Sequence, residues 1–226
     1  MSTVSLVIPL HQGERFIAEA IASARDQDQP PREVIVVDDG STDAGPSIVE
    51  AIGGVVLLRQ DPRGPGAARN RGIEAATGEL IAFLDQDDLL RPAALRRHRE
   101  TLDAHPEAML SVCRQRFAVL DGEVVPEWQR PDLLDRETIA WTPSCLCIRR
   151  ETFRRIGLFD ESLHATSDLL WCREYRGHGL PFVELEETLV DRRVHARCQS
   201  ADGATIRREM LEVFRRAAAS RRREAP

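Results

Sequence analysis

The sequence predicts an α/β fold in which a mostly parallel central sheet is flanked by helices. Short apolar runs alternate with segments of helical periodicity through the first 105 residues. The runs are apolar throughout and rich in β-branched residues, as expected of parallel strands that are buried on both faces. Acidic residues directly follow two of the runs, at the sheet edge where α/β proteins bind their ligands.

The individual elements follow from these patterns. The predicted strands of the first half are residues 4–9, 34–37, 55–58 and 80–84. Apolar residues at helical spacing predict helices over 16–25, 47–52, 67–76 and 92–104. The second half is less regular. It predicts strands over 109–119, 182–185 and 188–194, helices over 151–156, 167–178 and 205–223, and a polar segment over 121–141.

Composition narrows the class of protein. The 226 residues suit one large domain, and the net charge of −6 supplies no overall basic field for nucleic acid. No apolar stretch reaches the roughly 20 residues that span a bilayer. The N-terminus lacks a basic region and predicts a first strand instead of a signal peptide, so we expect a cytoplasmic protein.

The reactive residue types exclude further chemistry. The five cysteines are odd in number and contain no CxxC pair, which favours reduced thiols over a disulfide framework or a zinc site. All the basic residues are arginine, so a P-loop lysine and a Schiff base are excluded. The absence of lysine also argues against phosphatases that use an aspartate nucleophile after a strand, because they need a later lysine.

The stretch FLDQDD raises the main question of the sequence. Asp85, Asp87 and Asp88 follow the apolar run 80–84, and like charges this close disfavour one another's ionisation. One interpretation is that Asp88 caps the next helix while the others lie on a solvated turn. The other is a divalent cation. Asp38 and Asp39 end an earlier strand, so the two acidic clusters are expected to face one crevice.

Four stretches taken together resemble family 2 glycosyltransferases with the nucleotide-sugar-binding GT-A fold. They are VSLVIPLHQGERFIAEAI, VIVVDDGSTD, GPGAARNRGIEAATGELIAFLDQDD and IGLFDESL. The resemblance covers about residues 4–200. It implies a donor-binding half over 1–105, an acceptor and catalytic half over 106–200 and a basic terminal helix over 201–226. It also implies an inverting transfer of sugar from a nucleotide diphosphate, with a UDP-sugar expected first, to a hydroxyl acceptor.

The resemblance assigns the base and ribose contacts to Asp38 and Asp39, and carboxylates can accept hydrogen bonds from both groups. The alternative interpretation is a turn, in which Gly40 adopts a positive φ and Ser41 or Asp43 caps the next helix. Both interpretations can hold for the same segment.

The base-binding wall departs from the family pattern. Pro9 should flank the base, but His11 and Gln12 stand where relatives usually have Tyr and Asn, which leaves the preferred base open. Arg69 matches an arginine near the nucleotide and could give two donors to a phosphate or carboxylate. It could instead neutralise one of the acidic clusters.

The family's DxD motif answers the question raised by FLDQDD. It matches Asp85 and Asp87, and hard carboxylate oxygens suit Mg²⁺ or Mn²⁺ bound together with substrate phosphates. The resemblance makes Asp87 the main metal ligand, gives Asp85 to ribose or sugar, and leaves Asp88 as a helix cap or a donor-sugar contact. In the segment RRVHARCQS, Arg193 should face the diphosphate and His195 should reach phosphate or the metal.

The catalytic base implied by the resemblance is Asp168. It lies eleven residues before Gly179, which is the family spacing. Ser167 and Leu170 replace acids that the family usually has, and a different alignment would put Ser167 in the base position. We prefer Asp168, because serine is no base at neutral pH without activation. The same replacements motivate the rival hypothesis of a non-catalytic nucleotide-sugar-binding module.

Two segments leave their roles open. Trp128 and Trp141, in or beside the polar segment, are either stacking surfaces for an acceptor or core residues. The terminal helix carries seven arginines against two glutamates over 205–223. It would either rest on anionic lipid at the inner membrane face, near a lipid-linked acceptor, or remain a solvated helix.

Overall fold

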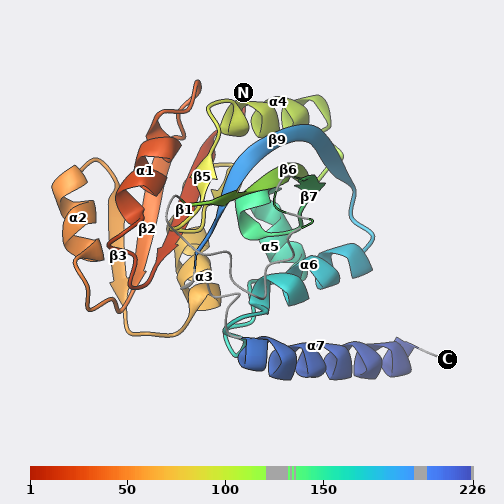
Figure 1. Cartoon of the computed structure of the whole chain (residues 1–226). Coiled ribbons are helices and arrows are strands. Elements are labelled where there is room, and N and C mark those ends of the chain that lie inside the picture. The colour runs from red at the N-terminus through yellow and green to blue at the C-terminus, as the bar shows by residue number, and fades with distance from the viewer. Residues whose placement is uncertain (121–131, 133, 135, 196–202, 225–226) are drawn as a thin grey trace.

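The computed structural model describes residues 1–120, 132, 134, 136–195 and 203–224, and residues 203 and 216–224 by their backbone alone. Within these ranges, nine strands form one curled sheet in the order β3-β2-β1-β4-β8-β6-β9-β5, with β7 paired to β6 (Figure 1).

The first half builds the parallel part of this sheet. Its strands are β1 (Val4–Leu10), β2 (Glu33–Asp39), β3 (Val56–Gln60) and β4 (Leu80–Phe83). Neighbouring strands pair in parallel, with Val7 opposite both Ile35 and Phe83. Because the strands run in the same direction, the segments that follow β1, β2 and β4 emerge at the same sheet edge.

The second half adds antiparallel pairs. Its strands are β5 (Leu89–Leu90), β6 (Leu110–Val119), β7 (Glu137–Ile139), β8 (Leu146–Arg149) and β9 (Phe182–Val194). Strand β8 is antiparallel to both β4 and β6, whereas β9 is parallel to β6. The pairing register of β6 with β9 shifts between Val112 and Gln115.

Two apolar layers cover the sheet. One face packs against α1 (Ile17–Arg25), α2 (Gly45–Ile52) and α4 (Ala94–Ala104). The other face packs against α3 (Pro65–Ala75), α5 (Arg150–Ile156) and α6 (Ser167–Gly177). In β1, Leu6 and Ile8 face the first layer and Val7 faces the second, which explains why every residue of this strand is buried.

The remaining helix, α7 (Gly203–Glu224), lies outside these layers and beside α6 (Figure 1). Its Val213 packs with Leu163 and Leu170 in a small separate cluster. One face of α7 is therefore packed against the rest of the chain, and the choice between solvent and anionic lipid for its exposed side stays a prediction. None of the described helices combines the length and the apolar character needed to cross a membrane.

The α/β fold with a flanked central sheet is confirmed, and the predicted elements of the first half are present with ends shifted by a few residues. The two strands expected over 182–185 and 188–194 are one strand, β9, because the register shift accommodates the polar residues between them. Strands β5, β7 and β8 were not predicted. They are two to four residues long and carry too little pattern to be recognised.

Candidate active site

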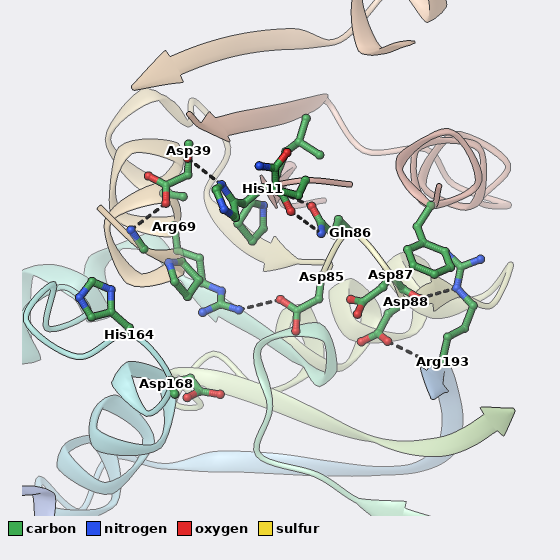
Figure 2. Close-up of a pocket in the computed structure, with 18 of the residues that line it drawn as sticks. His11, Asp39, Arg69, Asp85, Gln86, Asp87, Asp88, His164, Asp168 and Arg193 are labelled. Carbon is green, nitrogen blue, oxygen red and sulfur yellow. Dashed lines mark hydrogen bonds and ion pairs between the residues drawn. The ribbon is translucent and has the colours of Figure 1, made fainter. Parts of the chain in front are cut away.

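A cavity of about 1160 Å³ opens at the carboxyl ends of β1, β2 and β4 (Figure 2). Segments far apart in the sequence line it: the loop after β1, the end of β2, the start of α3, the DQDD loop after β4, the start of α6 and the end of β9. The parallel strand order brings these segments together, as expected for α/β sheets.

The segments after β1 and β2 meet at His11 and Asp39. The Nδ1 atom of His11 lies 2.9 Å from the backbone oxygen of Asp39. Because a carbonyl only accepts, Nδ1 carries a proton. The Asp39 carboxylate accepts from the backbone N–H groups of Arg63 and Gly64, at 2.8 and 2.7 Å. Asp39 therefore shapes the loop that leads into α3, and Pro9 lines the same cavity.

Asp38 has a different position from its neighbour. It is buried, and its carboxylate accepts from the N–H of Ser41 at 2.9 Å, within the turn after β2. Gly40 in this turn has a φ of +71°, and Asp43 accepts from the first N–H of α2 at Gly45. The turn interpretation thus describes this segment, and Asp38 is not among the described residues that line the cavity. A nucleotide contact by Asp38 stays a prediction.

Gln86 joins the DQDD loop to the loop after β1. Its side-chain oxygen accepts from the N–H of His11 at 2.8 Å, and its Nε2 donates to the His11 carbonyl at 2.9 Å. The side-chain amide of Gln86 thus makes the same two hydrogen bonds to the His11 backbone that a neighbouring β-strand would make. A Cβ on Gly13 would lie 2.5 Å from the Gln86 side chain, so the contact also requires glycine there.

Arg69 lies between two acidic groups on one side of the cavity (Figure 2). It is 5% exposed, and its Nη2 lies 2.6 Å from Oδ1 of Asp85. Burial lowers the pKa of Arg69, but Asp85 and Asp168 outweigh it and hold the pKa above its usual value. Burial raises the pKa of Asp168, and the charge of Arg69 opposes that rise. The structure therefore agrees with the interpretation that Arg69 neutralises acidic groups of the site.

Asp88 also belongs to the DQDD loop, and its side chain points into the protein interior. Its carboxylate accepts from the Ser144 hydroxyl at 3.0 Å and from the backbone N–H of Arg193 at 3.1 Å. Burial, together with Asp87 and Asp85, raises the pKa of Asp88 well above its usual range. The helix-cap interpretation of Asp88 is wrong, because α4 begins at Ala94 with no side-chain cap. Asp88 ties the DQDD loop to the second half of the chain instead.

Asp87 and His195, the two metal ligands that the family resemblance implies, lie beside each other in the structure. The Nε2 atom of His195 lies 3.0 Å from Oδ2 of Asp87. Among the described residues, no hydrogen bond reaches Oδ1 of Asp87. No three His, Cys, Asp or Glu side chains in the described ranges gather as a metal site of their own. The Asp87 carboxylate is a donor that suits a hard cation, which is commonly held by one or two carboxylates together with substrate phosphates.

Arg193 is held from three sides at the end of β9. It is 3% exposed, donates to the Asp87 carbonyl and forms an ion pair with Glu19 of α1. Its guanidinium carbon lies 4.9 Å from the centre of the Phe16 ring, and that ring lies 4.5 Å from the His195 ring. The segment from Arg193 to His195 therefore packs against the first turn of the chain's first helix.

The start of α6 places two candidate bases in the cavity. Ser167 and Asp168 both line it. The Asp168 carboxylate accepts from the N–H of Leu169 at 2.8 Å, and Ser167 is buried against the Gly66 turn of α3. Leu170 packs into the cluster with Val213, so the family acid that it replaces would be buried among apolar side chains here.

Of Trp128 and Trp141, only Trp141 lies within the described residues. Trp141 is partly buried and packs against the core, with its ring centre 6.1 Å from that of Tyr175 and 4.9 Å from that of Phe182. It is absent from the described cavity lining, to which its neighbour Thr142 contributes. Trp128 lies outside the described residues.

Sequence reasoning missed several polar residues at this site, among them Gln86, Ser144, His164 and Arg192. Ser144 donates to Asp88 and accepts from the N–H of Asp85 at 3.0 Å. Arg192 feels the charges of Asp88, Asp85 and Asp87, which raise its pKa against the effect of burial. Of these residues, only Arg192 could have been found from a sequence motif, since it is the first arginine of the RRVH segment. The others act through partners that are distant in the sequence.

Comparison with known proteins agrees with this architecture. Residues 5–165 match the model of glycosyl transferase family 2. The succinoglycan biosynthesis protein ExoO of Rhizobium meliloti (strain 1021) is 42% identical over 133 residues, which are 58% of this chain and 38% of ExoO. The chain thus spans well under two thirds of this relative's length.

Two solved structures share the fold. The TarS 1–349 complex with UDP-GlcNAc from Staphylococcus aureus has a TM-score of 0.69 and 23% identity, covering 89% of this chain and 61% of TarS 1–349. Mannosyltransferase PcManGT from Pyrobaculum calidifontis, in complex with GDP-Man and Mn²⁺, has a TM-score of 0.72 and 20% identity, covering 96% and 64%. The chain therefore belongs to glycosyl transferase family 2 and has the GT-A fold.

Proposed function

We propose that the chain is an inverting, divalent-metal-dependent glycosyltransferase that moves a sugar from a nucleotide diphosphate to a hydroxyl acceptor. One observation carries the proposal: a single cavity collects Asp39, the DQDD loop, Arg69, Asp168 and His195. Its volume of about 1160 Å³ exceeds the roughly 300–1,000 Å³ of ordinary small-molecule pockets, which leaves room for two substrates.

The proposed roles follow the lining. The side that carries Pro9, His11 and Asp39 receives the base and ribose, with a UDP-sugar as the expected donor. Asp168 takes the proton from the acceptor hydroxyl as that oxygen attacks the anomeric carbon, and the nucleotide diphosphate leaves from the opposite face of the sugar. A raised pKa suits this role, because it makes the carboxylate a stronger base.

Positive charge must reach the departing diphosphate. Arg193 and Arg192 line the cavity close to the DQDD loop. Asp87, with His195 beside it, would hold Mn²⁺ or Mg²⁺, which would stabilise the charge on the leaving group. That PcManGT was solved with GDP-Man and Mn²⁺ supports this assignment.

The first test is a thermal-shift panel of UDP, GDP, dTDP and CDP, each with Mn²⁺ and with EDTA. A nucleotide at 100 times its dissociation constant adds about 2.7 kcal/mol to the stability of the folded state. We expect one nucleotide to shift the melting temperature only with Mn²⁺, and the shift to vanish in Asp87→Ala. The exposed Asp61→Ala, outside the cavity lining, is the matched control and keeps the shift. No shift for any nucleotide would overturn the proposal.

The rival hypothesis of a non-catalytic binding module is tested by turnover. UDP-GlcNAc and GDP-Man serve as probes, because water can replace an unknown acceptor and release the diphosphate. We expect slow, Mn²⁺-dependent hydrolysis of one donor, which is lost in Asp168→Asn while nucleotide binding persists. Binding without hydrolysis of either sugar nucleotide would favour the module.

A further inference from the structure

The terminal helix holds the segment that precedes α6. Glu209 of α7 is 5% exposed, and its Oε1 accepts from the N–H of His164 at 2.9 Å. Its Oε2 accepts from the N–H groups of Ala165 and Thr166, at 2.8 and 3.0 Å, and from the Thr166 hydroxyl at 3.1 Å. Three successive backbone N–H groups form a concave nest for an anion, and a carboxylate from α7 fills it.

The contact is that of a charged group. Burial raises the pKa of Glu209, but the hydrogen bonds from Ala165, His164 and Thr166 outweigh burial and hold the pKa below its usual value. Glu209 is thus ionised at neutral pH. Hydrogen bonds to an ionised acceptor are roughly twice as strong as those between neutral groups.

The clamped segment leads directly into the active site. His164 and Ala165 line the cavity, and Ser167 and Asp168 follow them at the start of α6. Val213, one turn beyond Glu209 on α7, packs against Leu163 and Leu170. Apolar contacts from α7 therefore lie on both sides of the hydrogen-bonded segment 164–166.

The same helix reaches the cavity itself. Ile206, on the turn before Glu209, is part of the lining. Residues 203–224 lie beyond the part of the chain that the family model matches, which ends at 165. The donor-binding side at β1, β2 and β4 makes none of these contacts.

We propose that Glu209 is a positioning residue for Asp168. The role rests on the proposed function, because it assigns Glu209 to the alignment of the base. By holding the N–H groups of 164–166, Glu209 fixes where α6 begins and so where the Asp168 carboxylate stands relative to the bound donor.

The test compares Glu209→Ala and Glu209→Gln with wild type and with Glu212→Gln. Glu212 lies on the same helix, three residues further along, and pairs with Arg215 at 4.0 Å. Amide hydrogen exchange of residues 164–166 is measured first. We expect faster exchange there in Glu209→Ala, a smaller increase in Glu209→Gln, which keeps one acceptor oxygen, and no change in Glu212→Gln.

Kinetics then separate positioning from general damage. With UDP-GlcNAc or GDP-Man, whichever wild type hydrolyses, we expect kcat of Glu209→Ala to fall at least tenfold. The Mn²⁺-dependent Kd for the matching nucleotide should stay within about twofold. Glu209→Gln should recover part of kcat, and Glu212→Gln should match wild type.

Every outcome of these measurements either supports or contradicts the positioning role of Glu209. Unchanged amide exchange, unchanged kcat, or a loss of nucleotide affinity as large as the loss of kcat would overturn the positioning role while leaving the transferase intact. A wild-type chain that hydrolyses neither sugar nucleotide would overturn both proposals. The two failures are distinguishable because the first leaves wild-type turnover in place.

Discussion

The Nη2 atom of Arg69 lies 2.6 Å from Oδ1 of Asp85, and the same guanidinium lowers the pKa of Asp168. One buried cation therefore serves an aspartate of the DQDD loop and the candidate base of α6. The two halves of the proposed active site are coupled through it, although Asp85 and Asp168 are widely separated in the sequence.

This coupling predicts the effect of Arg69→Met on the pH profile. Without the positive charge, the pKa of Asp168 rises further, because burial and Asp85 both raise it. The acid limb of donor hydrolysis should move to higher pH, measured as kcat between pH 4 and 8. Arg71→Met, on the same helix, should leave the limb in place. A limb that stays or moves to lower pH in Arg69→Met would contradict the coupling.

Asp168→Asn should stabilise the free protein while abolishing hydrolysis. The pKa of Asp168 is raised on folding, so the folded state binds this proton more tightly than the unfolded state does. Ionising Asp168 therefore costs stability as pH rises, and the cost is complete above the folded pKa. Asparagine does not ionise. The melting temperature of Asp168→Asn should exceed that of wild type at pH 7, and the gap should narrow toward pH 4. A variant less stable than wild type at pH 7 would refute this.

Packing of α3 on β1 gives a prediction about stability alone. A Cβ on Gly72 would lie 2.2 Å from Cγ1 of Val7, which is fully buried. Gly72→Ala should cost about 1–3 kcal/mol of unfolding free energy, because neither element can move away. Gly177→Ala is the matched control at the end of α6, where a new Cβ meets nothing within 4 Å. It should gain about 0.4–1 kcal/mol by restricting the unfolded chain. Urea denaturation measures both, and equal costs would contradict the packing argument.

The sequence was most informative where structure is set locally. The strands of the first half are continuous apolar runs, so their positions and their common edge followed directly from pattern. Strands β7 and β8 gave no such signal, since they depend on pairing with β6 and not on their own composition.

The candidate site divides in the same way. The acidic residues were recognisable by their place after strands, but their partners were not. Ser144 reaches Asp88 across 56 residues, and Glu209 reaches Thr166 across 43. Such contacts arise only once the chain has folded, and no local spacing records them. The interpretation of Asp88 as a helix cap failed for this reason.

Gln86 supplies the last prediction, because it joins the DQDD loop to the loop after β1 through two hydrogen bonds to the His11 backbone. Gln86→Met keeps the length of the side chain and removes both bonds, each worth about 0.5–1.5 kcal/mol. If these bonds hold the base-binding side in place before the donor arrives, then without them part of the binding free energy of the nucleotide is used to order the loop. The Mn²⁺-dependent Kd should weaken roughly ten- to a hundredfold, measured by calorimetry, since 1.4 kcal/mol is a factor of ten. Gln86→Glu keeps an acceptor for the His11 N–H, so its Kd should fall between those of wild type and Gln86→Met. A Kd of wild-type strength in Gln86→Met would mean that the loop is ordered by other contacts, such as the bond from His11 to Asp39.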